Sequence, residues 1–106
     1  MRIILITLVI LLQGCGIPEE KDISNNIDKG MEKMDESAFD ESWDHAKSIE
    51  DYLHLIHYKY NKKDIKEMDN HLKKLDYSSV VMDKKKSEKE WKTVKKIWEK
   101  MKQNKK

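Results

Sequence analysis

Apolar residues recur every three or four positions along most of the chain after residue 20, and this spacing places them on one face of an α-helix. The first such segment covers Lys21 to about Glu36. Its apolar positions are Ile23, Ile27, Met31 and Met34. Gly30 lies within the segment and weakens a helix by about 1 kcal/mol relative to alanine. The pattern still predicts an amphipathic helix here.

A second helix is predicted after Ser37. Ser37 and Asp40 have the spacing of a capping box, in which both side chains accept hydrogen bonds from backbone N–H groups of the first turn. The apolar positions that follow are Phe39, Trp43, Ala46, Ile49, Leu53, Ile56 and Tyr60. Asn61-Lys62-Lys63 is typical of a turn, and either Asn61 or Asp64 can cap the next helix.

Two further helices are predicted in the remaining chain. The third has apolar positions at Ile65, Met68, Leu72 and Leu75, and it reaches Met82 only through the poor helix formers at 77–81, which we expect to fray or bend. Lys84-Lys85-Lys86 interrupts the pattern, and Ser87 with Glu90 is a second capping-box candidate. The last helix has apolar positions at Trp91, Val94, Ile97, Trp98 and Met101, and we expect residues 104–106 to fray.

Together these segments predict an all-α fold, a small antiparallel bundle of three to four amphipathic helices over residues 21–103. Charged residues make up 40% of the chain, and it holds only three glycines and one proline, a composition that favours helices over turns and strands. Short connections favour antiparallel neighbours. A single small domain of this size is only marginally stabilised by its own core, so pairing with another protein or with itself stays open.

The beginning of the chain has a different pattern. Met1-Arg2 is followed by ten nearly unbroken apolar residues, Ile3 to Leu12, whereas a membrane-spanning helix needs roughly 20. A charged start, a short apolar stretch and small residues after it are the parts of a secretory leader. Leu12-Gln13-Gly14-Cys15 resembles the lipobox of bacterial lipoproteins. An ordinary cleaved leader and an uncleaved apolar helix are the alternatives.

The resemblance to the bacterial lipoprotein class implies that residues 1–14 are a signal peptide and that Cys15 carries a diacylglyceryl group. Residues 15–20 would then be the lipidated cysteine and a short tether. Two acyl chains suffice for stable anchoring, since each buried CH₂ contributes about 0.8 kcal/mol. The implied location is the cell membrane, on its extracytoplasmic face. Cys15 is the only cysteine, so the chain forms no internal disulfide.

Charge is distributed unevenly along the chain. Residues 16–45 have a net charge of −7, residues 46–82 of +1 and residues 83–106 of +7. The last helix combines two tryptophans with many lysines, and such a helix can lie on an anionic membrane, enter a partner's groove or bury its tryptophans in the core. We take it as the candidate interaction face: Trp91, Trp98, Lys92, Lys95 and Lys96. No nucleic-acid-binding motif accompanies the lysines, so nucleic acid is not expected as a partner.

Residues that could carry chemistry are few. His54 and His57 lie one helical turn apart, near Glu50, but two histidines need a third ligand to hold a metal ion, and the spacing is not HExxH. The three glycines leave no phosphate-binding loop or nucleophile elbow. We therefore expect no metal ion, no cofactor and no enzymatic activity.

These observations predict a lipid-anchored, extracytoplasmic helical protein that acts as a non-enzymatic binding module with a protein partner. Immunity and exclusion lipoproteins are one such class, because blocking an incoming toxin, phage or conjugative element requires only a binding surface at the membrane. The alternative is an accessory structural subunit of a membrane-associated envelope complex.

Overall fold

The computed structural model describes residues 19–105, so the predicted signal peptide, Cys15 and most of the tether lie outside the described residues. The described chain is all-α, as predicted. It forms helices α1 (Glu20–Asp35), α2 (Phe39–Ile56), α3 (Lys62–Val80) and α4 (Lys84–Gln103), with a short 3₁₀ turn η1 (His57–Lys59) between α2 and α3. None of these helices is both long and apolar enough to cross a membrane.

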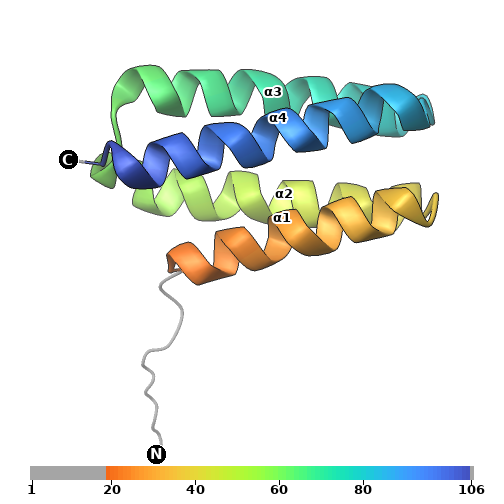
Figure 1. Ribbon diagram of the computed structural model, residues 1–106, viewed down its shortest axis with the longest axis horizontal. Helices are drawn as coiled ribbons and strands as arrows, with labels where there is room; N and C mark the ends of the chain where they lie inside the picture. Colours follow the sequence, from red (N-terminus) through yellow and green to blue (C-terminus); the bar gives the residue numbers. More distant parts are fainter. Residues whose placement is uncertain (1–18, 106) are drawn as a thin grey trace, which may run out of the picture.

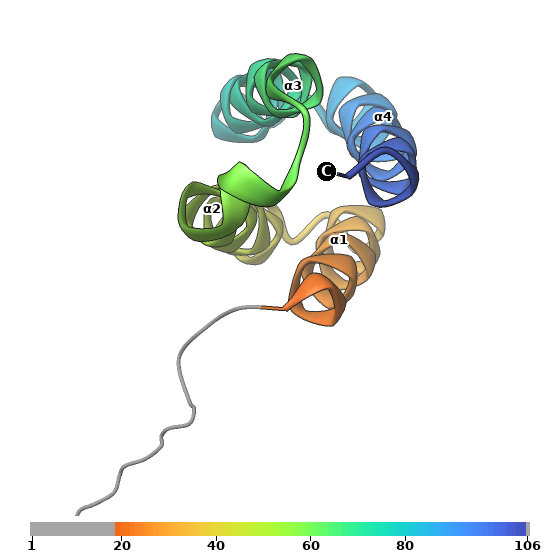
Figure 2. The same ribbon diagram turned by 90° about the vertical axis from the view of Figure 1, so that its left-hand side faces the viewer.

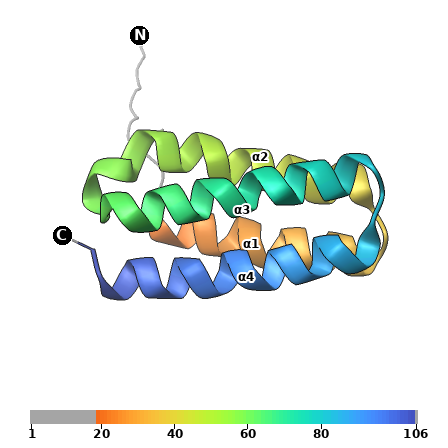
Figure 3. The same cartoon turned by 90° about the horizontal axis from the view of Figure 1, so that it is seen from above.

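The four helices run alternately up and down and form an antiparallel bundle (Figure 1). Seen along the bundle, each helix packs beside its neighbours in sequence, and α4 closes the ring against α1 (Figure 2). The α1–α2 and α3–α4 connections lie together at one end, which we call the tip (Figure 3). The other end, the base, holds the start of α1, the α2–α3 connection with η1 and the end of α4. The short connections account for this topology, because they allow only antiparallel neighbours.

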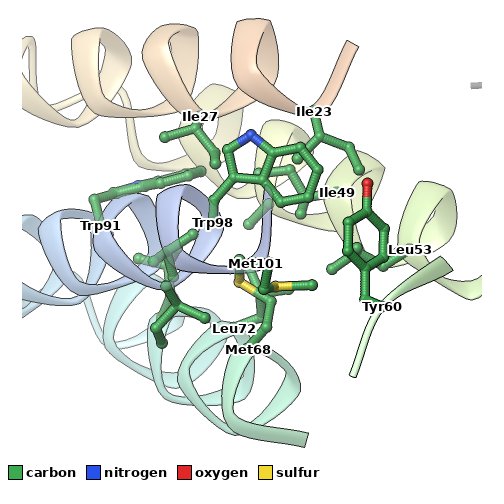
Figure 4. Close-up of a cluster of buried hydrophobic side chains, with 14 of the residues drawn as sticks. Ile23, Ile27, Ile49, Leu53, Tyr60, Met68, Leu72, Trp91, Trp98 and Met101 are labelled. Atoms are coloured by element: carbon green, nitrogen blue, oxygen red, sulfur yellow. The ribbon is translucent and has the colours of Figure 1, made fainter. Parts of the chain in front are cut away.

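The core is formed by the apolar faces that the spacing predicted. Trp91 and Trp98 of α4 lie at its centre, each 1% exposed, between isoleucines of α1 and α2 and methionine and leucine side chains of α3 and α4 (Figure 4). The Tyr60 ring, which follows η1, lies 5.6 Å from the Trp98 ring between centroids. Both indole N–H groups are satisfied, because Trp91 Nε1 donates to Ser42 Oγ and Trp98 Nε1 to Ser24 Oγ, each at 2.8 Å.

The two connections at the tip have the same structure, which differs from the prediction. Ser37 and Met82 have φ values of 62° and 59°, in the left-handed region. In each turn, the N–H group of this residue and that of the residue after it donate to carbonyl groups in the last turn of the preceding helix, as in a Schellman motif. Ser37 therefore terminates α1 and does not cap α2, whose N-cap position is Ala38. The predicted Ser37–Asp40 capping box is wrong because the backbone of Ser37 is already used in the turn.

α4 also begins earlier in the chain than the predicted cap at Ser87. Asp83 is its N-cap, and the Asp83 side chain accepts a hydrogen bond from the Lys86 backbone at 3.1 Å. Ser87 lies inside the helix, is fully buried and donates to Ser78 Oγ at 2.9 Å. The Ser87–Glu90 capping box is therefore wrong.

The remaining helix ends compare more closely with the sequence. Asn61 caps α3 as one of the two predicted candidates, with its side chain bonded to the Lys63 backbone. The predicted weak stretch at 77–81 stays helical as far as Val80. α4 ends at Gln103; after it the Asn104 N–H bonds back to the last turn, and Lys105 Nζ lies 3.2 Å from Glu20 Oε2 of α1.

Candidate functional site

The interaction face predicted on the last helix does not exist as such. Trp91 and Trp98 are buried in the core, because their large apolar area is removed from water there and their N–H groups find serine partners. Lys92 and Lys96 lie exposed on the outside of α4, whereas Lys95 lies at its edge toward α1, where its Nζ is 3.6 Å from Asp28 Oδ1. Because Trp91 and Trp98 are each only 1% exposed, they cannot form an interaction face with these lysines, and this prediction is corrected.

The lysines nevertheless form a pattern of their own. Lys85, Lys89, Lys92 and Lys96 are exposed and spaced four, three and four residues apart, so they form a row along the outside of α4. Within residues 19–105, no ion pair is found for any of these four, whereas the neighbouring Lys95 lies 3.6 Å from Asp28 of α1. The row is a basic stripe parallel to the bundle axis.

His54 and His57 both lie exposed near the base. Their rings are 6.2 Å apart between centroids, and Nδ1 of His57 lies 2.8 Å from the backbone oxygen of His54. Among residues 19–105, no three His, Cys, Asp or Glu side chains lie close enough together to hold a metal ion.

Three charged groups lie between α2 and α3. Lys47 Nζ lies 3.7 Å from Glu50 Oε1 and 3.4 Å from Asp76 Oδ2. Burial raises the pKa of Glu50, and the Asp76 carboxylate beside it raises it further, against the opposing effect of Lys47. One oxygen of each carboxylate, Glu50 Oε2 and Asp76 Oδ1, is buried without a hydrogen-bond partner. Glu50 also lines a groove of about 580 Å³ between α2 and α3, together with His54, His57 and Asp69.

Another carboxylate lies at the base, where the ends of the described chain meet. Tyr60 OH donates to Glu20 Oε2 at 2.7 Å, and Lys105 pairs with the same carboxylate. Burial acts to raise the pKa of Glu20, but the hydrogen bonds from Tyr60 and Lys105 outweigh it and lower the pKa. This contact joins α1, the end of η1 and the end of α4, and it is structural.

The most unusual surface lies at the tip. Four large apolar residues at the end of α3 and in the turn after it are between 52% and 71% exposed. Together with two partly buried aromatic residues at the start of α2 they form what we call the tip surface: Phe39, Trp43, Tyr77, Val80, Val81 and Met82. Soluble proteins rarely expose apolar groups in one contiguous patch unless it binds something.

The interior at this end of the bundle has the opposite character. Ser42, Ser78, Ser79 and Ser87 are all buried there, next to the exposed valines. Ser42 Oγ donates to the Gly30 carbonyl at 2.8 Å, and Ser78 Oγ to that of Leu75 at 3.1 Å. At the tip, therefore, small polar residues share the core with Met34 and Trp91, while several large apolar residues face the solvent.

A shallow groove of about 720 Å³ crosses the tip surface, which is within the range of ligand pockets in proteins. Phe39, Trp43, Val80 and Met82 supply its apolar lining, and the two charged residues that line it are Asp40 and Glu41. The Lys47 ammonium group lies 5.5 Å from the centre of the Trp43 ring, within the range of a cation–π contact.

The sequence contained a signal for this surface that the helical pattern alone did not reveal. The poor helix formers at 77–81 predict a weak helix end, but Tyr77, Val80 and Val81 also fall outside the apolar face set by Leu72 and Leu75. Because 77–80 is helical, the residues that continue the buried face are Ser78 and Ser79. The sequence signal for the tip surface is therefore a set of apolar residues that do not continue the buried face of their own helix.

A comparison with protein-family models, with curated proteins and with solved structures finds no match to this chain. Its function has to be inferred from the surface itself.

Proposed function

We propose that this protein is a lipid-anchored, non-enzymatic binding module on the extracytoplasmic face of a bacterial cell membrane, and that the tip surface is where it binds a protein partner. The resemblance of Leu12-Gln13-Gly14-Cys15 to a lipobox supports the anchor. The exposed apolar residues of the tip support the binding role, since a contiguous apolar patch of this kind marks interaction sites.

The observation that carries the proposal is the position of the tip surface relative to the start of the bundle. Glu19, the N-cap of α1, lies at the base, and three residues separate it from Cys15, so the four peptide units between them span at most about 14 Å. A lipid on Cys15 would therefore hold the base near the bilayer. The tip lies at the other end of the helices, about 30 Å away along a 20-residue helix such as α4.

A binding surface held away from the membrane suits a protein that intercepts something approaching the cell. Immunity and exclusion lipoproteins are such a class, and they need a surface and no active site.

A permanently covered tip would instead indicate an accessory subunit of an envelope complex. A monomeric, well-folded protein in detergent favours the first role. Aggregation that is relieved by Tyr77→Ser favours the second.

Contact of the α4 lysines with anionic lipid is a second candidate role, favoured by the unpaired row of Lys85, Lys89, Lys92 and Lys96 within the described chain. In that case the bundle would lie flat on the bilayer. Binding of the unlipidated protein to anionic vesicles would then weaken as salt is raised, because exposed charges are screened over about 8 to 10 Å at physiological ionic strength. Salt-insensitive binding would exclude this role.

The anchor is tested by mass spectrometry of the protein extracted from membranes. We expect a mature chain that begins at Cys15 and carries a diacylglyceryl group. A Cys15→Ala variant should yield no lipidated protein, and its leader should not be cleaved before residue 15. A membrane-extracted chain with an unmodified Cys15 would contradict the anchor.

A further inference from the structure

We infer that the occupant of the tip surface is an apolar segment of another protein that carries lysine or arginine side chains. The inference deepens the proposed function and depends on the tip surface being its binding site. It rests on the charge of the groove and on the backbone at Met82.

The charged residues that line the groove are both carboxylates. Asp40 and Glu41 lie in the first turn of α2, beside the apolar floor formed by Phe39, Trp43 and Val80. Among residues 19–105 no ion pair is found for Asp40, and Glu41 pairs with Lys33 at 3.6 Å. Glu36 and Glu41 together raise the pKa of that lysine. A partner with apolar side chains for the floor and basic side chains for the rim is therefore electrostatically complementary to this groove.

The same carboxylates argue against the other occupants. An anionic lipid surface would be repelled by Asp40 and Glu41. A second copy that docked tip to tip would bring two pairs of carboxylates against each other across an apolar contact, which costs free energy.

The backbone at Met82 supplies an independent observation. A residue in the left-handed region at a helix end is usually glycine, or sometimes asparagine, because a side chain is strained there. Met82 has a φ of 59°, and its side chain is 67% exposed, so it gains little from packing in this chain. A flexible, polarisable methionine at such a position suits a surface that adapts to a partner.

The experiment is site-specific photocrosslinking in intact cells that produce the full-length protein. A photoreactive amino acid replaces Val80 in the groove, and in a matched control it replaces Leu55, an exposed aliphatic residue at the base. We expect adducts from position 80 and not from position 55. Mass spectrometry of the crosslinked peptide should identify a partner segment with apolar residues and a net positive charge.

Matched variants then test which features of the tip surface hold the partner. Tyr77→Ser should lower the yield of the adduct about tenfold, since few residues carry most of the free energy of an interface. Tyr58→Ser, which changes a tyrosine of equal exposure at the base, should not. Asp40→Asn with Glu41→Gln should lower the yield about fivefold, and the exposed Asp51→Asn on the same helix should leave it unchanged.

Several outcomes would overturn the inference. They are an acidic partner segment, an adduct with lipid or with a second copy of the chain, equal adducts from positions 80 and 55, and no adduct from position 80. Failure of the anchor is separate from all of these, because it would appear as an unmodified Cys15 in the mass spectrum whatever the crosslinks show.

Discussion

Gly30 shows how a residue that weakens a helix can be required by packing. A Cβ atom at this position would lie 2.2 Å from Cζ2 of Trp91, far inside van der Waals contact. The carbonyl of the same residue accepts the hydrogen bond from Ser42, which in turn accepts from the Trp91 indole. The sequence identified Gly30 only as a weak point of α1, because the partner lies 61 residues further along the chain.

We therefore expect Gly30→Ala to lower the free energy of unfolding by up to about 2 kcal/mol, because overpacking a core usually costs about 1 to 3 kcal/mol. The gain in helix propensity, about 1 kcal/mol, is too small to offset it when the Trp91 ring cannot move. Urea denaturation followed by circular dichroism measures the change. Lys29→Ala, at the exposed neighbouring position, is the control and should change the value by less than about 0.5 kcal/mol. A more stable Gly30→Ala protein would disprove the packing of α4 on α1.

Met82 and Ser37 hold equivalent places in the two turns of the tip, both in the left-handed region. Met82→Gly should raise the free energy of unfolding by up to about 1 kcal/mol, because glycine adopts this conformation without strain. The same substitution should reduce the crosslink from position 80, so stability and binding would change in opposite directions. Ser37→Gly should stabilise similarly. If Met82→Gly destabilises the protein, the side chain has a structural role and the strain argument fails.

At the scale of helices, the apolar spacing predicted each element and nearly all of its buried face. Ile23 and Ile27 of α1 and Leu72 and Leu75 of α3 are examples, because a face that is removed from water must repeat at the helical period. The helix ends were less predictable. Ser37 and Ser87 both have the sequence of an N-cap, but one adopts a left-handed turn and the other is buried inside α4. Those outcomes depend on contacts between helices, which local sequence does not record.

The contact between α2 and α3 should make the stability depend on pH. The pKa of Glu50 in the folded protein lies above its ordinary value, so the folded state binds this proton more tightly than the unfolded state. Above the pKa of Glu50 in the folded protein, the charged carboxylate therefore lowers the free energy of unfolding. This loss of stability disappears as the pH falls through the folded pKa toward the pKa of glutamate in the unfolded chain, about 4.3.

Glu50→Gln removes this charge and should raise the free energy of unfolding at pH 7, by less than about 1 kcal/mol because the group is partly solvated. At pH 3 the variant and the original protein should be equally stable. Denaturation midpoints measured at both pH values test this, with Asp51→Asn on the exposed side of α2 as the control. A Glu50→Gln variant that is less stable at pH 7 would show that the pair with Lys47 outweighs burial.

At the scale of the whole molecule, charge divides between the two helical hairpins. Residues 20–56 contain eleven acidic residues and four lysines, whereas residues 57–105 contain eight acidic residues and sixteen lysines. A few ion pairs join the hairpins, such as Lys95 with Asp28 and Lys105 with Glu20. Exposed pairs of this kind contribute roughly 0 to 1 kcal/mol each, so the shared core and not the ion pairs holds the hairpins together.

The polarity from base to tip could not be predicted from the sequence. Local spacing identified the helices, but only the bundle brings Phe39 and Trp43 of α2 beside Val80 and Met82, about 40 residues later, to line one groove. The same packing buried the tryptophans that had been proposed as the interaction face. Residues that are apolar and out of register with their own helix, such as Val80, are the sequence feature that best indicates this kind of site.

The central claim is that the base lies at the membrane and the tip points away from it. Because Cys15 is the only cysteine and is proposed to carry the lipid, a second cysteine introduced by mutation can be labelled alone. Val80→Cys, Tyr58→Cys and Lys92→Cys place a fluorophore at the tip, at the base and on the lysine row of α4.

The decisive measurement is the quenching of each fluorophore by nitroxide-labelled lipid headgroups in vesicles that hold the lipidated protein. The account predicts strong quenching at position 58 and little at position 80, about 30 Å further along the bundle. Quenching at positions 80 and 92 as strong as at position 58 would show a bundle that lies flat on its lysine row, and would contradict the account.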